Sequence, residues 1–180
     1  MSSIAHAAAA DLYRCIRDIP DFPKPGIVFK DITPLLLDPV QLRRAIELMA
    51  APFRGDRVSR VISIESRGFL LGAPIALALE AGLVPIRKPG KLPAEHGRVE
   101  YSLEYGTDAL EMHTDAVSSA DRVLIVDDVL ATGGTAEAAA KLVRAHRGQV
   151  VGFTFLIELD FLKGRRRLAA ERVEALLHYT

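Results

Sequence analysis

Residues 123–135 read VLIVDDVLATGGT, and this part of the sequence is the most informative about the fold. Its first four residues form a continuous apolar run rich in β-branched side chains, which is typical of a strand buried on both faces of a parallel sheet. Two acids follow, then a loop of small residues, and a helical pattern begins near Gly134. The stretch therefore predicts a strand–loop–helix unit of an α/β fold.

The loop of this unit has the residue types that a phosphate site requires. In open α/β sheets, ligands bind at the carboxyl ends of strands, which is where the two acids fall. The glycine pair lets backbone N–H groups approach a ligand closely, and the start of the helix adds a partial positive charge. The candidate site consists of Asp127, Asp128, Ala131, Thr132, Gly133, Gly134 and Thr135.

The two carboxylates indicate which ligand the loop holds. They would repel a bare phosphate, so the ligand must also carry hydroxyl donors or a divalent cation, and a ribose 5-phosphate fits this requirement. The simpler alternative is that Asp127 and Asp128 cap a helix and that Gly133-Gly134 is only a turn. The loop matches neither the Walker A sequence nor the dinucleotide-binding glycine signature.

Residues 126–135 closely resemble the phosphoribosyl-pyrophosphate loop of type I phosphoribosyltransferases. Further segments resemble the adenine-specific members of that family, and together they cover nearly the whole chain in the expected order. These segments are residues 22–32 (FPKPGIVFKDI), 65–69 (ESRGF), 87–93 (RKPGKLP), 101–106 (YSLEYG) and Glu158-Leu159.

The resemblance implies a type I phosphoribosyltransferase fold: an α/β domain with a mostly parallel central sheet flanked by helices. It also implies one domain over residues 1–180, with a small N-terminal base-recognition hood at about 1–35 and a flexible catalytic loop at 87–106. The apolar patterns predict helices at 6–17, from Asp38, at 69–80 and at 134–146, and strands at 27–29, 58–64, 84–86, 123–126 and 150–157. Residues 87–106, rich in glycine, proline and charge, read as a loop or a hairpin.

For the leaving pyrophosphate, the resemblance assigns Ser66, Arg67, Lys88 and Lys91. Fixed cations and Mg²⁺ stabilise the negative charge that develops as pyrophosphate departs. The resemblance therefore implies Mg²⁺ as the cofactor, held mainly through the substrate, with no direct protein ligand expected. The alternative for these cations is an ordinary surface ion pair and a solvated loop.

For the base, the resemblance assigns Phe29 and Leu159 to the two faces of adenine, and the Val28 and Lys30 backbone to its edge. A purine offers apolar faces and a few hydrogen-bonding edges, so such a sandwich suits it, although Phe29 could also be a core aromatic. Glu104 is the implied catalytic residue, because a carboxylate near the purine can accept or share the proton that the base loses. Its alternative is an exposed loop acid.

The implied reaction converts adenine and phosphoribosyl pyrophosphate to AMP and pyrophosphate in purine salvage, by a homodimer. Two alternatives remain open at this point. One is an enzyme of the same fold that acts on another base. The other is a regulator that binds the phosphoribosyl donor or a nucleotide without catalysis.

The composition limits the classes of partner that the protein is expected to bind. The 180 residues carry 23 basic and 23 acidic side chains, so no overall field favours nucleic acid or an anionic membrane, and neither partner is expected. A single cysteine excludes an intramolecular disulfide, no apolar stretch is long enough to span a membrane, and a cytoplasmic location is expected. The run Arg165-Arg166-Arg167 reads as a solvated helix end.

Overall fold

The computed structural model describes residues 11–102 and 107–180, which fall into two compact units. The first unit covers residues 1–47 and the second covers residues 48–180. The prediction of one domain over 1–180 stays a prediction.

The first unit is a small antiparallel pair of strands followed by helices. Its elements are β1 (Arg17–Pro20), β2 (Val28–Asp31), α2 (Thr33–Leu37) and α3 (Pro39–Ala50), the last of which continues into the second unit. The register places Arg17 opposite Asp31 and Asp18 opposite Lys30, and both pairs form ion pairs, at 2.6 and 2.7 Å. The helix predicted to run to residue 17 is therefore wrong at its end, because cross-strand pairing overrides the local helical pattern.

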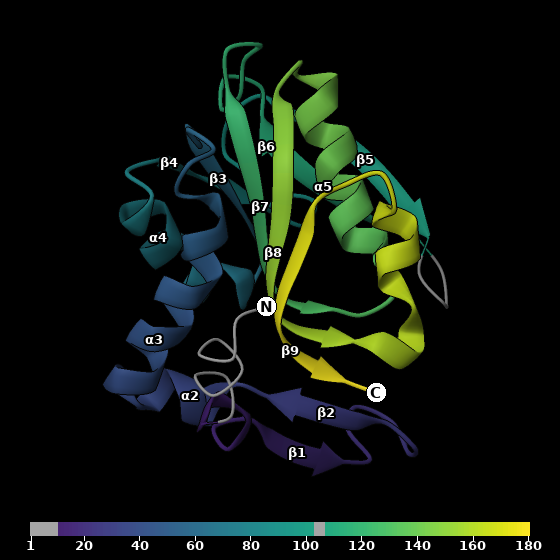
Figure 1. Cartoon of the computed structure of the whole chain (residues 1–180). Helices are drawn as coiled ribbons and strands as arrows, with labels where there is room; N and C mark the ends of the chain where they lie inside the picture. Colours follow the sequence, from purple (N-terminus) through teal and green to yellow (C-terminus); the bar gives the residue numbers. More distant parts are fainter. Residues whose placement is uncertain (1–10, 103–106) are drawn as a thin grey trace. The chain divides into compact units, whose positions relative to one another are not determined.

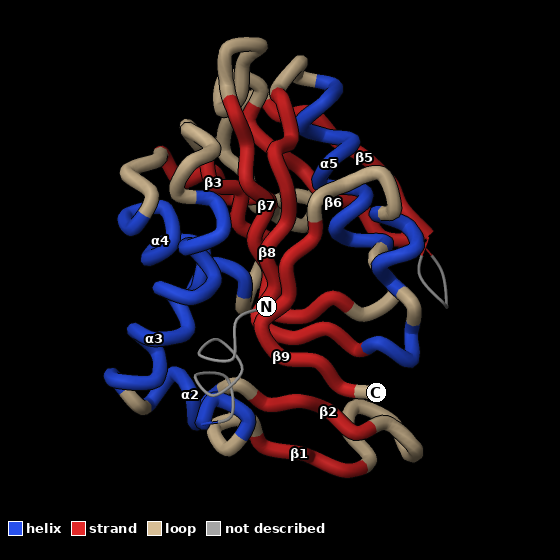
Figure 2. The backbone as a smooth tube through the Cα atoms, viewed as in Figure 1, coloured by secondary structure: helices blue, strands red, loops and turns tan. Residues whose placement is uncertain are grey.

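The second unit is built on a five-stranded parallel sheet in the order β4-β3-β7-β8-β9 (Figures 1 and 2). The strands are β3 (Arg60–Ile64), β4 (Gly82–Ile86), β7 (Arg122–Leu130), β8 (Gln149–Leu159) and β9 (Val173–Tyr179). This sheet confirms the predicted α/β class with a mostly parallel sheet. The sequence patterns missed β9 at the sheet edge.

Two helices cover the sheet on opposite sides (Figure 1). These helices are α4 (Gly68–Ala78) and α5 (Gly134–Ala145). The second unit also contains three short 3₁₀ helices, η1 (Ala51–Phe53), η2 (Asp160–Leu162) and η3 (Gly164–Leu168). Helix α4 approaches β3 closely because Gly72 has no side chain: a Cβ there would overlap the Ser63 hydroxyl.

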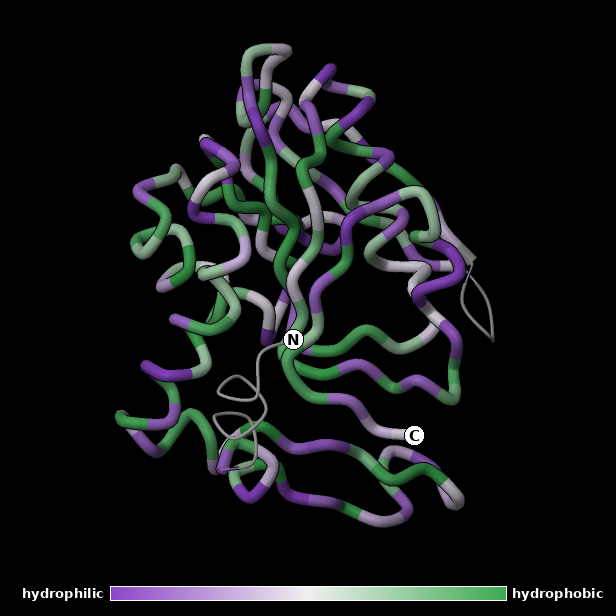
Figure 3. Tube along the Cα trace, viewed as in Figure 1, coloured by the Kyte–Doolittle hydropathy of each residue, from purple (hydrophilic) through white to green (hydrophobic). Residues whose placement is uncertain are grey.

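A hairpin of β5 (His96–Ser102) and β6 (Thr107–His113) packs with α5 over the same core. Of the segment 87–106, which was predicted to be a loop or a hairpin, residues 96–102 form the first strand of this hairpin, whereas residues 88–95 form no helix or strand. The core is continuous from the hairpin through the sheet, and Figure 3 shows the hydrophobic colouring along β7. It includes Ile62, Val84, Leu110, Val123, Ile125 and Phe153.

Candidate active site

Strand β7 brings two carboxylates to the carboxyl edge of the sheet. It extends beyond the predicted four residues because its pairing with β8 continues as far as Leu130 opposite Glu158. Burial raises the pKa of Asp127 well above its usual value, and the charge of Asp128 raises it further. Burial also raises the pKa of Asp128, although the nearby Arg67 guanidinium opposes that rise.

The loop after β7 leads into the N-terminus of α5 through a left-handed residue. Gly133 has φ of 81° and stands at the N-cap, where a side chain would be strained, and an added Cβ would lie 2.5 Å from the Gly164 carbonyl oxygen. The loop lines a cavity of about 70 Å³, far smaller than a site for a whole drug-sized ligand. Its lining includes Asp127, Ala131, Thr132, Gly133 and Thr135.

Arg67 reaches this loop from the end of β3. Its Nε lies 2.9 Å from Asp128 Oδ2, and that buried oxygen accepts no hydrogen bond of good geometry from any residue in the described ranges. Gly68 lets the first turn of α4 approach, since a Cβ there would lie 2.8 Å from Asp127 Oδ1. Ser66, just before Arg67, is exposed. Arg67, predicted to bind pyrophosphate, therefore contacts Asp128, predicted to bind the ribose.

Glu65 was not predicted as a site residue, yet it gathers three donors. It accepts hydrogen bonds from Arg87 Nε at 2.9 Å, the Lys88 backbone N–H at 3.1 Å and Lys91 Nζ. Burial alone would raise the pKa of Glu65, but the hydrogen bonds from Lys91, Arg87 and Lys88 outweigh it and lower the pKa to about 2. Its position at the end of β3, directly before Ser66, was the signal available in the sequence.

Lys88 lies on a second carboxylate that the sequence did not reveal. Its Nζ is 3.0 Å from Asp108 Oδ2, on β6. All three cations predicted to bind pyrophosphate are thus paired with acids: Arg67 with Asp128, Lys88 with Asp108, and Lys91 with Glu65. Each of these cations is therefore held by a carboxylate of the second unit.

The residues predicted to bind adenine are divided between the two units. Val28, Phe29 and Lys30 form most of β2, where Phe29 is half-buried and meets the Phe22 ring edge-to-face at 5.2 Å. Leu159 ends β8 in the second unit and is half-buried. The adenine sandwich therefore stays a prediction. Glu104 lies outside the described residues, and its catalytic role stays a prediction as well.

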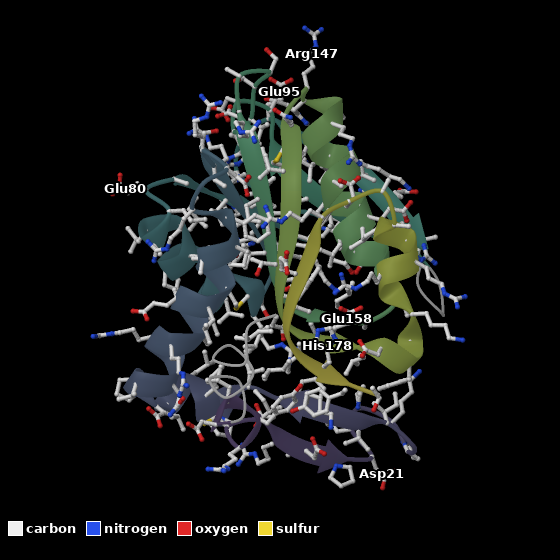
Figure 4. The ribbon with its side chains drawn as sticks, viewed as in Figure 1. Asp21, Glu80, Glu95, Arg147, Glu158 and His178 are labelled. Atoms are coloured by element: carbon white, nitrogen blue, oxygen red, sulfur yellow. The ribbon has the colours of Figure 1, made fainter. Side chains whose placement is uncertain are left out.

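A polar cluster lies at the ends of β8 and β9, and two of its residues, Glu158 and Asp160, flank Leu159 in the sequence. Glu158, Asp160 and His178 place ligand-type atoms within 4.8 Å of one another, and Figure 4 shows Glu158 and His178 side by side. Arg165 donates to both Glu158 oxygens, at 3.0 and 3.1 Å from its Nε, so a guanidinium occupies the carboxylate that a metal would need. The arginine run predicted as a solvated helix end thus lies in a 3₁₀ turn with one arginine tied to the sheet.

Comparisons with known proteins agree with this geometry. The family model described as the phosphoribosyl transferase domain matches residues 42–174. A relative from Myxococcus xanthus (strain DK1622), named adenine phosphoribosyltransferase, is 63% identical over 170 residues, which is 94% of this chain and 92% of the relative.

Solved structures of enzymes with that name have the same fold. The crystal structure from Rhodothermus marinus DSM 4252 has a TM-score of 0.93 and 54% identity, and the match covers 97% of this chain and 99% of that chain. The Saccharomyces cerevisiae structure, complexed with an imino-altritol bisphosphate and adenine, has a TM-score of 0.90 and 39% identity over 96% of this chain and 99% of that one. This chain therefore belongs to the adenine phosphoribosyltransferase family.

Proposed function

We propose that this protein transfers the phosphoribosyl group of phosphoribosyl pyrophosphate to adenine, forming AMP and pyrophosphate in purine salvage. The observation that carries the proposal is the meeting of β7, the α5 N-terminus and Arg67 at one edge of the sheet. A phosphate cradle, two carboxylates and a cation within one site match the three polar parts of this donor.

The 5′-phosphate would occupy the cavity of the 131–135 loop. Helix α5 has 12 residues, so its unpaired N–H groups and dipole favour an anion at that end. Thr132 and Thr135 line this cavity, and their hydroxyls would add hydrogen-bond donors to the phosphate. No lysine is needed in such a cradle.

The ribose hydroxyls would bind the carboxylates of Asp127 and Asp128. A hydroxyl is the donor that the buried Asp128 Oδ2 lacks. Burial raises the pKa of both acids because it removes hydration from their charged forms, and a bound hydroxyl would replace part of that hydration.

The pyrophosphate would bind to Arg67, Lys88 and Lys91, with Ser66 donating a hydrogen bond from the adjacent turn. These groups neutralise charge that grows as the bond to the anomeric carbon breaks, so they stabilise the transition state more than the bound donor. Magnesium fits this site as an ion that keeps several waters and binds mainly to substrate phosphates, beside at most one or two carboxylates. It would supply further charge neutralisation of the leaving pyrophosphate.

Adenine would lie between Phe29 and Leu159, with the Val28 and Lys30 backbone at its edge. Glu104 would accept or share the imidazole-ring proton that adenine loses as its nitrogen bonds to the anomeric carbon. Both assignments rest on the resemblance of residues 22–32 and 101–106 to the family.

We also propose a homodimer in the cytoplasm. Helix α4 contains no charged residue and exposes Leu70 and Leu77, and a helix that is apolar all round is normally buried. None of the helices in the described ranges has the length and apolarity that a membrane crossing requires. Sedimentation equilibrium of the wild type and Leu77→Glu tests the dimer: a wild-type monomer at micromolar concentration would refute it.

Pyrophosphate release tests the reaction directly. The protein is given phosphoribosyl pyrophosphate and Mg²⁺ with adenine, hypoxanthine, guanine, xanthine, uracil or orotate in turn. Release with adenine alone is the expected result. Release with another base would move the base assignment, and tight donor binding without any release would indicate the regulator.

A further inference from the structure

Asp108 lies between Lys88, one of the cations proposed to bind pyrophosphate, and Tyr101, which contacts the loop after β7. Its carboxylate is held on both oxygens: Oδ1 accepts the Ala109 backbone N–H at 2.8 Å, and Oδ2 accepts the Tyr101 hydroxyl at 3.2 Å. Lys88 Nζ lies 3.0 Å from the same Oδ2. The side chain of Asp108 is only 19% exposed, whereas that of Lys88 is 52% exposed. The acid is therefore fixed, and the lysine is the member that can move.

Tyr101 connects this pair to the loop after β7. It stands directly opposite Asp108 in the β5–β6 register and packs against the core. Burial raises the pKa of Tyr101, a hydrogen bond with the Thr135 side chain opposes that rise, and the negative charge of Asp108 adds to it. A line of polar contacts thus runs from Thr135 through Tyr101 and Asp108 to Lys88, all within the second unit.

We propose that Asp108 and Tyr101 are positioning residues that hold Lys88 for the pyrophosphate of the donor. One N–H of the ammonium binds Asp108, which leaves two for phosphate oxygens. Without the carboxylate, the four-carbon lysine stem would sample many rotamers, and binding the donor would have to order it. The inference rests on the proposed function, because it takes Lys88 as a pyrophosphate ligand.

The opposite arrangement is also chemically reasonable, and it makes the opposite prediction. If Asp108 only competed with pyrophosphate for Lys88, removing its charge would free the lysine and tighten donor binding. If Asp108 only stabilised the β5–β6 hairpin, its substitution would lower the stability of the protein, and any change in donor binding would not depend on Lys88.

The experiment is a double-mutant cycle on donor binding. Titration calorimetry with phosphoribosyl pyrophosphate and Mg²⁺, without a base, gives Kd for the wild type, Asp108→Asn, Lys88→Met and the double variant. We expect Asp108→Asn to raise Kd roughly five- to tenfold, the scale of coupling between contacting groups. In the Lys88→Met background, the same substitution should change Kd less than twofold.

Steady-state kinetics and conservative variants add independent readouts. Asp108→Asn should raise KM for the donor while leaving KM for adenine unchanged, and Asp108→Glu should recover part of the loss. Tyr101→Phe keeps the aromatic packing and should raise the donor Kd in the same direction by a smaller factor. Glu100→Gln is the matched control, because Glu100 lies on the same strand, is 66% exposed and pairs only with Arg98 among the described contacts.

Each outcome decides the matter. Tighter donor binding in Asp108→Asn, no change in Kd, or equal losses with and without Lys88 would overturn the positioning role. If the wild type binds the donor with the expected cycle but releases no pyrophosphate with any base, the positioning role stands and the proposed reaction fails. A wild type that does not bind the donor would overturn both.

Discussion

Asp128 and Glu104 are both carboxylates, but their predicted roles lie on opposite sides of the chemical step. Asp128 is buried, has an oxygen without a well-formed hydrogen bond and lies 2.9 Å from Arg67. Asp128→Asn should weaken donor binding by about 10- to 100-fold, since a hydrogen bond to a charged group contributes about 1.5–3 kcal/mol. Glu104→Gln should leave donor Kd within twofold and lower kcat by roughly 10²- to 10⁴-fold, the usual range for a general acid or base.

Calorimetry of donor binding and pre-steady-state pyrophosphate release separate these effects. Asp56→Asn is a suitable control for Asp128→Asn, because it breaks another aspartate–arginine pair of the same unit, Asp56–Arg172 at 2.7 Å, away from the phosphate loop. Its donor Kd should match that of the wild type. A Glu104→Gln variant that loses donor affinity and turnover equally would contradict the assignment of Glu104 to catalysis.

Among the elements, η3 packs against the phosphate loop, and no sequence motif predicted this contact. Gly164 begins η3 and is buried, and a Cβ there would overlap the Ala131 carbonyl. Gly164→Ala should therefore displace the 131–133 backbone, lower the free energy of unfolding by about 1–3 kcal/mol and raise donor KM. Gly55→Ala is the control, because nothing lies within 4 Å of its added Cβ. Chemical denaturation and donor kinetics of both variants test this, and wild-type donor KM in Gly164→Ala would contradict it.

The elements that were predicted correctly are those whose signal is local. The 123–126 run, its two acids and the glycines before α5 specify a strand, a turn and a helix start within one short stretch, and the structure has all three. The end of the first helix, strand β9 and the roles of Glu65 and Asp108 depend on partners far away in sequence. Asp108 meets Lys88 only because the hairpin folds back, and nothing in residues 87–93 indicates that contact.

At the scale of the whole molecule, pH acts on acids whose pKa values shift in opposite directions. The pKa of Asp127 is raised, so ionising it opposes folding, and that effect weakens as pH falls. The pKa of Glu65 is lowered from 4.5 to about 2, so its contribution is complete above about pH 4.5 and is lost as pH falls toward 2. The wild-type curve of stability against pH mixes both effects.

Comparing Glu65→Gln with the wild type isolates the second effect. At pH 7 the variant should be less stable by about 1–3 kcal/mol, because a half-buried acceptor of three hydrogen bonds loses its charge. The gap should narrow between pH 4.5 and pH 2.5, since protonation removes the same charge from the wild type. Urea unfolding at pH 7, 5, 4, 3 and 2.5 measures it, with Glu100→Gln as an exposed control that should show no gap at any pH. A gap that stays constant down to pH 2.5 would mean that the ionised form of Glu65 does not stabilise the fold.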